Sequence, residues 1–219
     1  AAPVDDRSVR IAAARAILPS CVAITGADPR RSYPLLPGEG AVGIPARRAE
    51  YSAGRAAAHA AMRGLGLSAL PVLTHPDRSP LWPYGLCGSI SHDDAFCLAA
   101  VARTTDLAGI GLDLEPATPL AADLWDSVLL PAEVDWLTGQ PLAGLLAKLL
   151  FSAKEAAYKA QYPQSKTLFG FEAMEVRVEG QDAFTATFRQ SVPGFAAGDR
   201  LAGRYAHAAG RILTVVTLP

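Results

Sequence analysis

The second half of the chain carries a short acidic motif, Gly-Leu-Asp-Leu-Glu over residues 111–115, whose residue types could bind a metal ion. On a strand, side chains two residues apart face the same side, so Asp113 and Glu115 point together while the intervening leucines point into the core. Two adjacent carboxylates repel one another unless they are solvated or share a divalent cation. Mg²⁺ prefers a few carboxylates together with phosphate oxygens and water. Taken alone, the motif leaves two interpretations open, a magnesium site and a solvated strand end.

A second motif, Phe-Ser-Ala-Lys-Glu-Ala-Ala-Tyr-Lys over residues 151–159, brings acidic and basic groups together on a predicted helix. Glu155 and Lys159 are four residues apart and share one helix face, while Lys154 lies about 100° around the helix. Glu and Lys at this spacing are a common surface pair that contributes only a few tenths of a kcal/mol. In isolation, the surface pair is the better interpretation.

Two further groups could contact phosphate. His92 ends a predicted strand after Ser89 and Ser91, where it could donate to a phosphate or serve as a hydrogen-bonded loop histidine. Arg55 follows Arg47 and Arg48 by eight and seven residues, so all three fall on one broad helix face. Clustered guanidinium groups suit phosphate because they pair with its oxygens in a bidentate way, and a solvated basic face is the alternative.

These residues need helices and strands to position them, and apolar periodicity predicts both. Helices are expected over 47–62, followed by glycines, and over 142–162, ended by Pro163. The proline-rich segment 71–83 is predicted to be a loop, and the first 30 residues alternate poorly. Strands are expected over 87–91, 96–102, 110–114, 173–178, 183–189 and 212–217.

The order of these elements favours an α+β fold. Residues 52–57 resemble residues 152–157, and both segments lie in predicted helices, as expected for two similar α/β subdomains produced by duplication. We place the boundary so that 1–106 form the N-terminal subdomain and 107–219 the C-terminal one. The 219 residues are enough for one large domain or two small ones.

Composition narrows the functional class. Half of the residues are apolar, 19% are charged, and the net charge of −1 argues against a nucleic-acid-binding protein. No stretch approaches the roughly 20 apolar residues of a membrane span, and segment 16–27 lacks the longer apolar core and cleavage site of a signal peptide. Cys21, Cys87 and Cys97 are too scattered for a disulfide framework or zinc site, and they favour a reducing, cytoplasmic location.

In combination, Gly111-x-Asp113-x-Glu115 followed by Phe151-x-x-Lys154-Glu155-x-x-x-Lys159 resembles the signature pair of the 4′-phosphopantetheinyl transferase superfamily. The spacing between the motifs resembles that of the longer, monomeric, pseudo-dimeric members. Segments 47–55, 78–83 and 88–92 resemble the branch that contains enterobactin-type siderophore enzymes. The resemblance implies two α/β subdomains related by a pseudo-two-fold axis, each with a small, mostly antiparallel sheet packed on a long helix.

The resemblance also implies roles for single residues. Asp113, Glu115 and Glu155 are expected to bind Mg²⁺, with Mn²⁺ as the alternative ion, together with the pyrophosphate of coenzyme A. Lys159 is expected to stabilise or protonate the leaving phosphate, and Glu155 or another group to accept the proton of the attacking serine. The other expected coenzyme A contacts are Arg47 (or Arg48), Arg55, Arg78, Ser91, His92 and Lys154.

The implied partners are coenzyme A and an acyl or peptidyl carrier protein of siderophore, other nonribosomal peptide, polyketide or fatty acid synthesis. Segment 166–171 is either a docking surface for that carrier or a core anchor. A monomer is expected, because two internal halves could complete one site. Two alternatives are a magnesium-dependent nucleotide pyrophosphohydrolase and a non-catalytic coenzyme A binding module.

Overall fold

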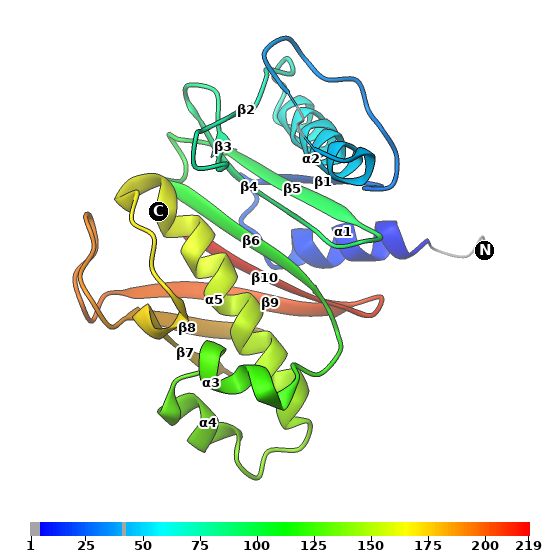
Figure 1. Ribbon diagram of the computed structural model, residues 1–219. Coiled ribbons are helices and arrows are strands. Elements are labelled where there is room, and N and C mark those ends of the chain that lie inside the picture. Colours follow the sequence, from blue (N-terminus) through cyan, green and yellow to red (C-terminus); the bar gives the residue numbers. More distant parts are fainter. Residues whose placement is uncertain (1–4, 41–42) are drawn as a thin grey trace.

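The computed structural model describes residues 5–40 and 43–219, and it confirms the α+β class (Figure 1). Two long helices, α2 (Pro45–Gly64) and α5 (Ala143–Ser165), lie where helices were predicted. The remaining helical elements are α1 (Asp6–Ala16), η1 (Ala122–Leu124), α3 (Trp125–Val128), α4 (Pro131–Leu137) and η2 (Phe171–Ala173).

The strands form two antiparallel sheets and one small hairpin. The first sheet has the order β1-β5-β4, and the second has the order β6-β10-β9-β8-β7. The first contains β1 (Ala23–Ala27), β4 (Leu86–His92) and β5 (Cys97–Arg103). The second contains β6 (Gly109–Pro116), β7 (Met174–Glu179), β8 (Ala183–Phe188), β9 (Arg200–Ala208) and β10 (Arg211–Leu218). The hairpin pairs β2 (Leu73–Thr74) with β3 (Pro80–Leu81).

Each sheet packs against one long helix. Helix α2 covers the three-stranded sheet, and α5 crosses the five-stranded sheet (Figure 1). The two halves therefore share a plan but differ in strand number. The predicted subdomain boundary at 106/107 falls between β5 and β6. It stays a prediction, because one apolar cluster contains residues of both sheets.

The two sheets meet where β4 runs beside β6, in the middle of the molecule (Figure 1). Serine hydroxyls of β4 accept backbone N–H groups of β6: Ser89 Oγ lies 3.0 Å from Leu112 N, and Ser91 Oγ lies 3.2 Å from Leu114 N. On the other side of β6, a Cβ added to Gly111 would lie 1.7 Å from the Ala156 carbonyl oxygen of α5. Only glycine therefore permits α5 to approach β6 this closely.

Some elements differ from prediction. Pro163 does not end α5, because a proline removes only one N–H and the helix continues to Ser165. The C-cap residue of α5 is Lys166, which has φ +51° and donates its N–H to the Tyr162 carbonyl at 2.9 Å. Helix α1 and strand β1 lie in the first 30 residues, and β9 occupies a stretch for which no strand was predicted.

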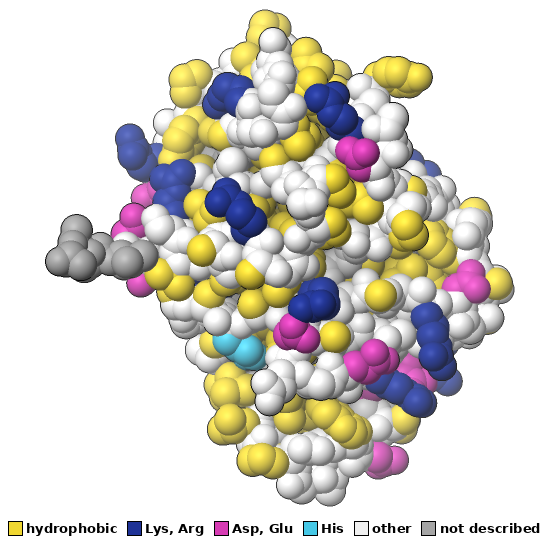
Figure 2. Space-filling model, turned by 180° about the vertical axis from the view of Figure 1, so that it is seen from behind, with side chains coloured by type: hydrophobic (Ala, Val, Ile, Leu, Met, Phe, Trp, Pro, Cys, Tyr) yellow, Lys and Arg dark blue, Asp and Glu magenta, His cyan; other side chains and the backbone are white. Residues whose placement is uncertain are grey.

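Among the described helices, none is long and apolar enough to cross a membrane. Figure 2 shows the face opposite to that of Figure 1, where basic and acidic side chains are interspersed with apolar ones. The charged side chains that could take part in a reaction lie instead at the junction between the two sheets.

Candidate active site

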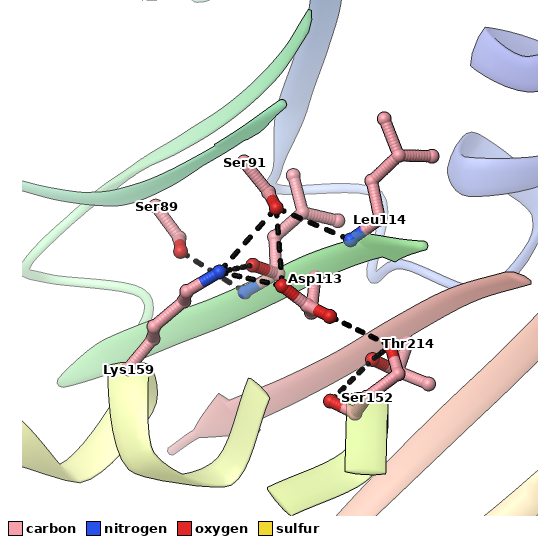
Figure 3. A network of polar contacts seen from close by, with 8 residues as sticks. Ser89, Ser91, Asp113, Leu114, Ser152, Lys159 and Thr214 are labelled. Carbon is pink, nitrogen blue, oxygen red and sulfur yellow. Dashed lines mark hydrogen bonds and ion pairs between the residues drawn. The ribbon is translucent and has the colours of Figure 1, made fainter. Parts of the chain in front are cut away.

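Asp113 of β6 is the centre of a buried polar network at this junction (Figure 3). Its side chain is about 5% exposed, and both carboxylate oxygens have partners. Oδ1 lies 2.6 Å from the Lys159 ammonium and accepts a hydrogen bond from Ser91 Oγ at 3.1 Å. Oδ2 accepts a hydrogen bond from Ser152 Oγ at 2.8 Å. Of the two interpretations that the motif left open, a solvated strand end does not fit Asp113, because its carboxylate is buried against neighbouring elements.

The network extends to two hydroxyls that sequence reasoning missed. Ser152 Oγ lies 2.8 Å from Thr214 Oγ1, which donates to the Ser152 carbonyl at 2.9 Å (Figure 3). Thr214 of β10 is the cross-strand partner of Asp113. Ser152 lies within the motif of residues 151–159, so the sequence could have indicated it as a site residue. Thr214 could be found only by knowing that β10 pairs with β6.

Glu115 lies two residues after Asp113 on the same side of β6, as predicted, and the leucines on either side of Asp113 are buried. Its Oε2 lies 3.2 Å from the ammonium of Lys148 on α5. Burial, followed by the charge of Asp113, raises the pKa of Glu115, and Lys148 opposes that rise. Lys148 was not singled out in the sequence, although it stands seven residues before Glu155 and so faces the same way.

Glu155 of α5 is half-buried beside the other two acids. Its pKa is raised mainly by burial and further by Asp113 and Glu115, while Lys159 acts in the opposite direction. The three carboxylates therefore share one electrostatic environment, in which an added cation would relieve mutual repulsion.

Within residues 5–40 and 43–219, no group of three or more His, Cys, Asp or Glu side chains is arranged to hold a metal ion. The predicted convergence of three acids on one ion is therefore not seen. Asp113 and Glu115 are instead paired with Lys159 and Lys148. The donor chemistry of three carboxylates fits Mg²⁺, and these lysine pairs identify the groups that such an ion would replace.

Lys154, predicted to be a coenzyme A ligand, lies in a buried ion pair. Its side chain is 2% exposed, and its ammonium lies 2.8 Å from Glu133 Oε2 of α4. The same ammonium donates to the carbonyls of Val128 at 2.9 Å and Phe171 at 3.1 Å. All three donors are used inside the protein, so the position of Lys154 supports a structural role.

A cavity of about 680 Å³ lies between α2, the β2–β3 hairpin and the end of β4. It collects four of the predicted phosphate ligands: Arg47, Arg55, Arg78 and His92. Among the described residues that line it, Arg47 is present and Arg48 is not, which favours Arg47 of the two expected ligands. Basic side chains from three separate segments thus face one hollow.

Arg55 forms part of the cavity wall and is mostly committed to internal partners. Its Nε donates to the Val72 carbonyl at 2.9 Å, and its guanidinium stacks 4.1 Å above the Tyr51 ring centroid. Burial lowers the pKa of Arg55. Its contacts therefore support the hairpin side of the cavity as well as lining it.

Ser91 and His92 were predicted to act together, and the structure separates them. Successive strand residues point to opposite sides, so His92 lines the cavity while Ser91 is buried against Asp113. Ser91 Oγ also lies 3.3 Å from the Lys159 ammonium. The predicted contact of Ser91 with the nucleotide is not supported by this position, because its hydroxyl is used within the acid–lysine network.

Two smaller cavities continue toward the acids. One of about 290 Å³ shares Arg78, Pro80 and Ile90 with the first cavity and is also lined by Lys159. A third of about 220 Å³ shares Tyr158 with the second and is lined by Glu155 and aromatic side chains. Shared lining residues therefore connect the three cavities one after another, from the basic cavity to Lys159 and on to Glu155.

A basic cavity that continues into an acid–lysine network is typical of an enzyme that transfers a phosphoryl-containing group. Comparison with protein families specifies the class. Residues 39–102 match the 4′-phosphopantetheinyl transferase N-terminal domain, and residues 109–209 match the 4′-phosphopantetheinyl transferase superfamily. The chain belongs to the 4′-phosphopantetheinyl transferase superfamily and is an enzyme of that class.

Three relatives illustrate the similarity. The 4′-phosphopantetheinyl transferase Svp of Streptomyces mobaraensis is 38% identical over 187 residues, covering 80% of this chain and 74% of the relative. The transferase PptT of Mycobacterium tuberculosis is 33% identical over 180 residues, covering 78% and 79%. Enterobactin synthase component D of Escherichia coli O157:H7 is 40% identical over 126 residues, covering 56% and 59%. The predicted resemblance to the siderophore branch is confirmed.

Proposed function

We propose that the chain transfers the 4′-phosphopantetheine group of coenzyme A to a serine of an acyl or peptidyl carrier protein. The other product is adenosine 3′,5′-bisphosphate. The observation that carries this proposal is the run of cavities, which leads from a cluster of basic side chains to Lys159 and Glu155. Family membership supports the same reaction.

The basic cavity is suited to the nucleotide end of coenzyme A. Arg47, Arg78 and His92 are exposed at its wall and can donate to phosphate oxygens. The 3′-phosphate is the group that His92 would contact. The diphosphate would then extend past Arg78, which also lines the adjoining cavity with Lys159.

Asp113, Glu115 and Glu155 are the residues that would hold Mg²⁺ or Mn²⁺. When bound, the ion neutralises charge on the diphosphate and orients it. Lys159 and Lys148 balance the charges of Asp113 and Glu115, so binding of the ion would require these ammonium groups to move away.

The transfer step requires one proton to move. The serine oxygen forms a bond to the β-phosphorus of coenzyme A while the bond to the leaving bisphosphate breaks. Glu155, which lines the cavity of about 220 Å³, would accept the serine proton. Lys159 donates a hydrogen bond to the leaving phosphate as charge develops there.

The carrier protein would dock where segment 166–171 lines the two smaller cavities, of about 290 Å³ and about 220 Å³. Leu168 is 74% exposed there, next to the exposed Lys166. Phe169 and Phe171 in the same segment pack against the core cluster of the C-terminal half. These positions support both predicted roles of segment 166–171, since it has two aromatic anchors and an exposed apolar and basic edge suited to an acidic carrier helix.

One chain supplies every proposed site residue, which supports activity as a monomer. Cys21, Cys87 and Cys97 are free thiols, which supports the expected cytoplasmic location. The pyrophosphohydrolase and the non-catalytic binding module are not favoured, because the relatives that match most of the chain are named as transferases.

The test is mass spectrometry of a carrier protein incubated with coenzyme A, Mg²⁺ and the enzyme. We expect the carrier to gain the mass of one phosphopantetheine group, and a carrier with its acceptor serine changed to alanine to gain none. Free phosphopantetheine with unmodified carrier would instead identify a hydrolase. A panel of carriers from siderophore, polyketide and fatty acid synthesis would then identify the one served.

A further inference from the structure

The β2–β3 hairpin that carries Arg78 is too short to hold its own position. Each strand has two residues, and isolated hairpins of this size are not stable. Within the turn, Arg78 N donates to the His75 carbonyl at 2.8 Å, and Arg78 has φ +71°. A residue with a Cβ adopts that conformation only where surrounding contacts impose it.

Asp77 supplies such contacts. Its Oδ1 accepts the Ser79 N–H at 2.8 Å and the Ser79 hydroxyl at 2.6 Å, which closes the turn. Its Oδ2 accepts the hydroxyl of Tyr162 on α5 at 2.7 Å. One carboxylate thus shapes the turn around Arg78 and joins it to the other half of the molecule.

Tyr162 is itself held in place. Its ring stacks on that of Tyr158, with centroids 5.5 Å apart, and the Lys166 ammonium lies 5.4 Å from its centroid. Tyr162 also stands three residues after Lys159, so both side chains lie on one face of α5. The hydroxyl that reaches Asp77 is therefore fixed relative to Lys159.

The hydrogen bond lies at the wall of the substrate path. Asp77, Arg78, Lys159 and Tyr162 all line the cavity of about 290 Å³. Arg78 additionally lines the basic cavity of about 680 Å³. Release of Asp77 from Tyr162 would free the hairpin from α5 and change the position of Arg78 toward both cavities.

We propose that Asp77 and Tyr162 form a clasp, defined as the Tyr162 hydroxyl bound to the Asp77 carboxylate, which positions Arg78 for coenzyme A. Both are positioning residues, since they act on the substrate through Arg78. The pKa values agree with this contact: the bond to Asp77 raises the pKa of Tyr162 to about 12, and bonds from Ser79 and Tyr162 lower that of Asp77. The identity of the ligand rests on the proposed function, whereas the clasp rests on geometry.

The test compares Tyr162→Phe with Tyr84→Phe, a matched control at a fully exposed tyrosine. For Tyr162→Phe we expect a rise of about tenfold in KM for coenzyme A, as for loss of a hydrogen bond to a charged group, with kcat changed less than about twofold. Without substrate, amides of residues 75–79 should exchange hydrogen faster than in the wild type. Tyr84→Phe should change none of these quantities.

A second variant separates positioning from general destabilisation. Asp77→Asn keeps an acceptor oxygen and should raise KM less than Asp77→Ala does. Asp77→Ala should raise KM at least as much as Tyr162→Phe, because it also removes the two bonds from Ser79. The double variant Asp77→Ala/Tyr162→Phe should be no worse than Asp77→Ala alone, because Asp77→Ala already removes the hydrogen bond that Tyr162→Phe deletes.

Unchanged exchange at residues 75–79 together with unchanged KM in Tyr162→Phe would overturn the clasp. So would a fall in kcat at constant KM, because Tyr162 would then act on the reacting groups. If the wild-type enzyme modifies no carrier but Tyr162→Phe still accelerates exchange at residues 75–79, the proposed function fails and the clasp stands.

Discussion

The basic cavity and the acid–lysine network lie side by side but are built in opposite ways. Arg47, Arg78 and His92 are exposed at the cavity wall and can meet a phosphate without giving up a buried partner. Asp113 is buried, and each of its oxygens already has a partner. The cavity is thus open to an anion, whereas the network would have to exchange a lysine for the proposed cation.

A single strand divides the two regions. In β4, Ser91 points to the network and His92 to the cavity, because side chains alternate along a strand. In the proposed function, the residues for the nucleotide and for the diphosphate are therefore neighbours on β4, one on each side of the strand. Substitutions on the two sides of β4 should produce different kinetic defects.

The largest effect is expected on the network side. Asp113→Asn removes the charge that Lys159 and the proposed cation both need, and transfer to a carrier protein should fall by at least about a thousandfold. Carrier mass gain against time measures this loss. Asp123→Asn, at an exposed carboxylate, is the control. Transfer at the wild-type rate by a folded Asp113→Asn protein would contradict the assigned role.

Lys154 and Lys159 sharpen the comparison, because they stand on one helix but in different pairs. Lys154→Met leaves Glu133 buried without its partner and should cost about 3–5 kcal/mol of unfolding free energy. Denaturant unfolding measures that cost. Lys159→Met should instead lower turnover with a much smaller change in stability, since its ammonium is nearer to solvent. Normal stability with weakened coenzyme A binding in Lys154→Met would restore its predicted role as a ligand.

A moderate effect is expected on the cavity side. His92→Ala should raise KM for coenzyme A by about tenfold and have less effect on dephospho-coenzyme A, which lacks the 3′-phosphate. Steady-state kinetics with coenzyme A and with dephospho-coenzyme A measures both KM values. His207→Ala, at an exposed histidine of β9, is the control. An equal effect of His92→Ala on both substrates would remove His92 from the 3′-phosphate.

The smallest effect concerns pH. The raised pKa of Glu155 means that the folded chain binds this proton more tightly than the unfolded chain does. Its contribution to stability therefore increases as pH falls from neutrality through the raised pKa, and it stops changing below the ordinary glutamate value of 4.5. Glu155→Gln should flatten this part of the pH profile relative to the wild type in thermal unfolding. Parallel profiles would show that burial does not perturb Glu155.

Patterns within single helices and strands were sufficient to predict much of this arrangement. Strand alternation correctly placed Asp113 and Glu115 on one side, with buried leucines between them. Alanine-rich periodicity located α2 and α5 within a few residues. These features depend on neighbours within one element, which is the information a single sequence carries best.

Contacts between distant elements could not be predicted in the same way. The resemblance implied that Lys154 contacts coenzyme A. Its buried ion pair with Glu133 could not be predicted, because Glu133 lies on α4, a helix that no pattern indicated. Thr214 joins the network only because β10 pairs with β6 in a particular register. The clasp between Asp77 and Tyr162 likewise depends on the docking of the β2–β3 hairpin against a helix from the other half.

The most direct test of the metal assignment is anomalous diffraction from crystals of the enzyme grown with Mn²⁺ and coenzyme A. We expect one manganese peak in contact with Asp113, Glu115 and Glu155, and the Lys159 ammonium displaced from Asp113 toward a phosphate oxygen. A manganese peak elsewhere, with the 2.6 Å pair between Lys159 and Asp113 intact, would contradict it.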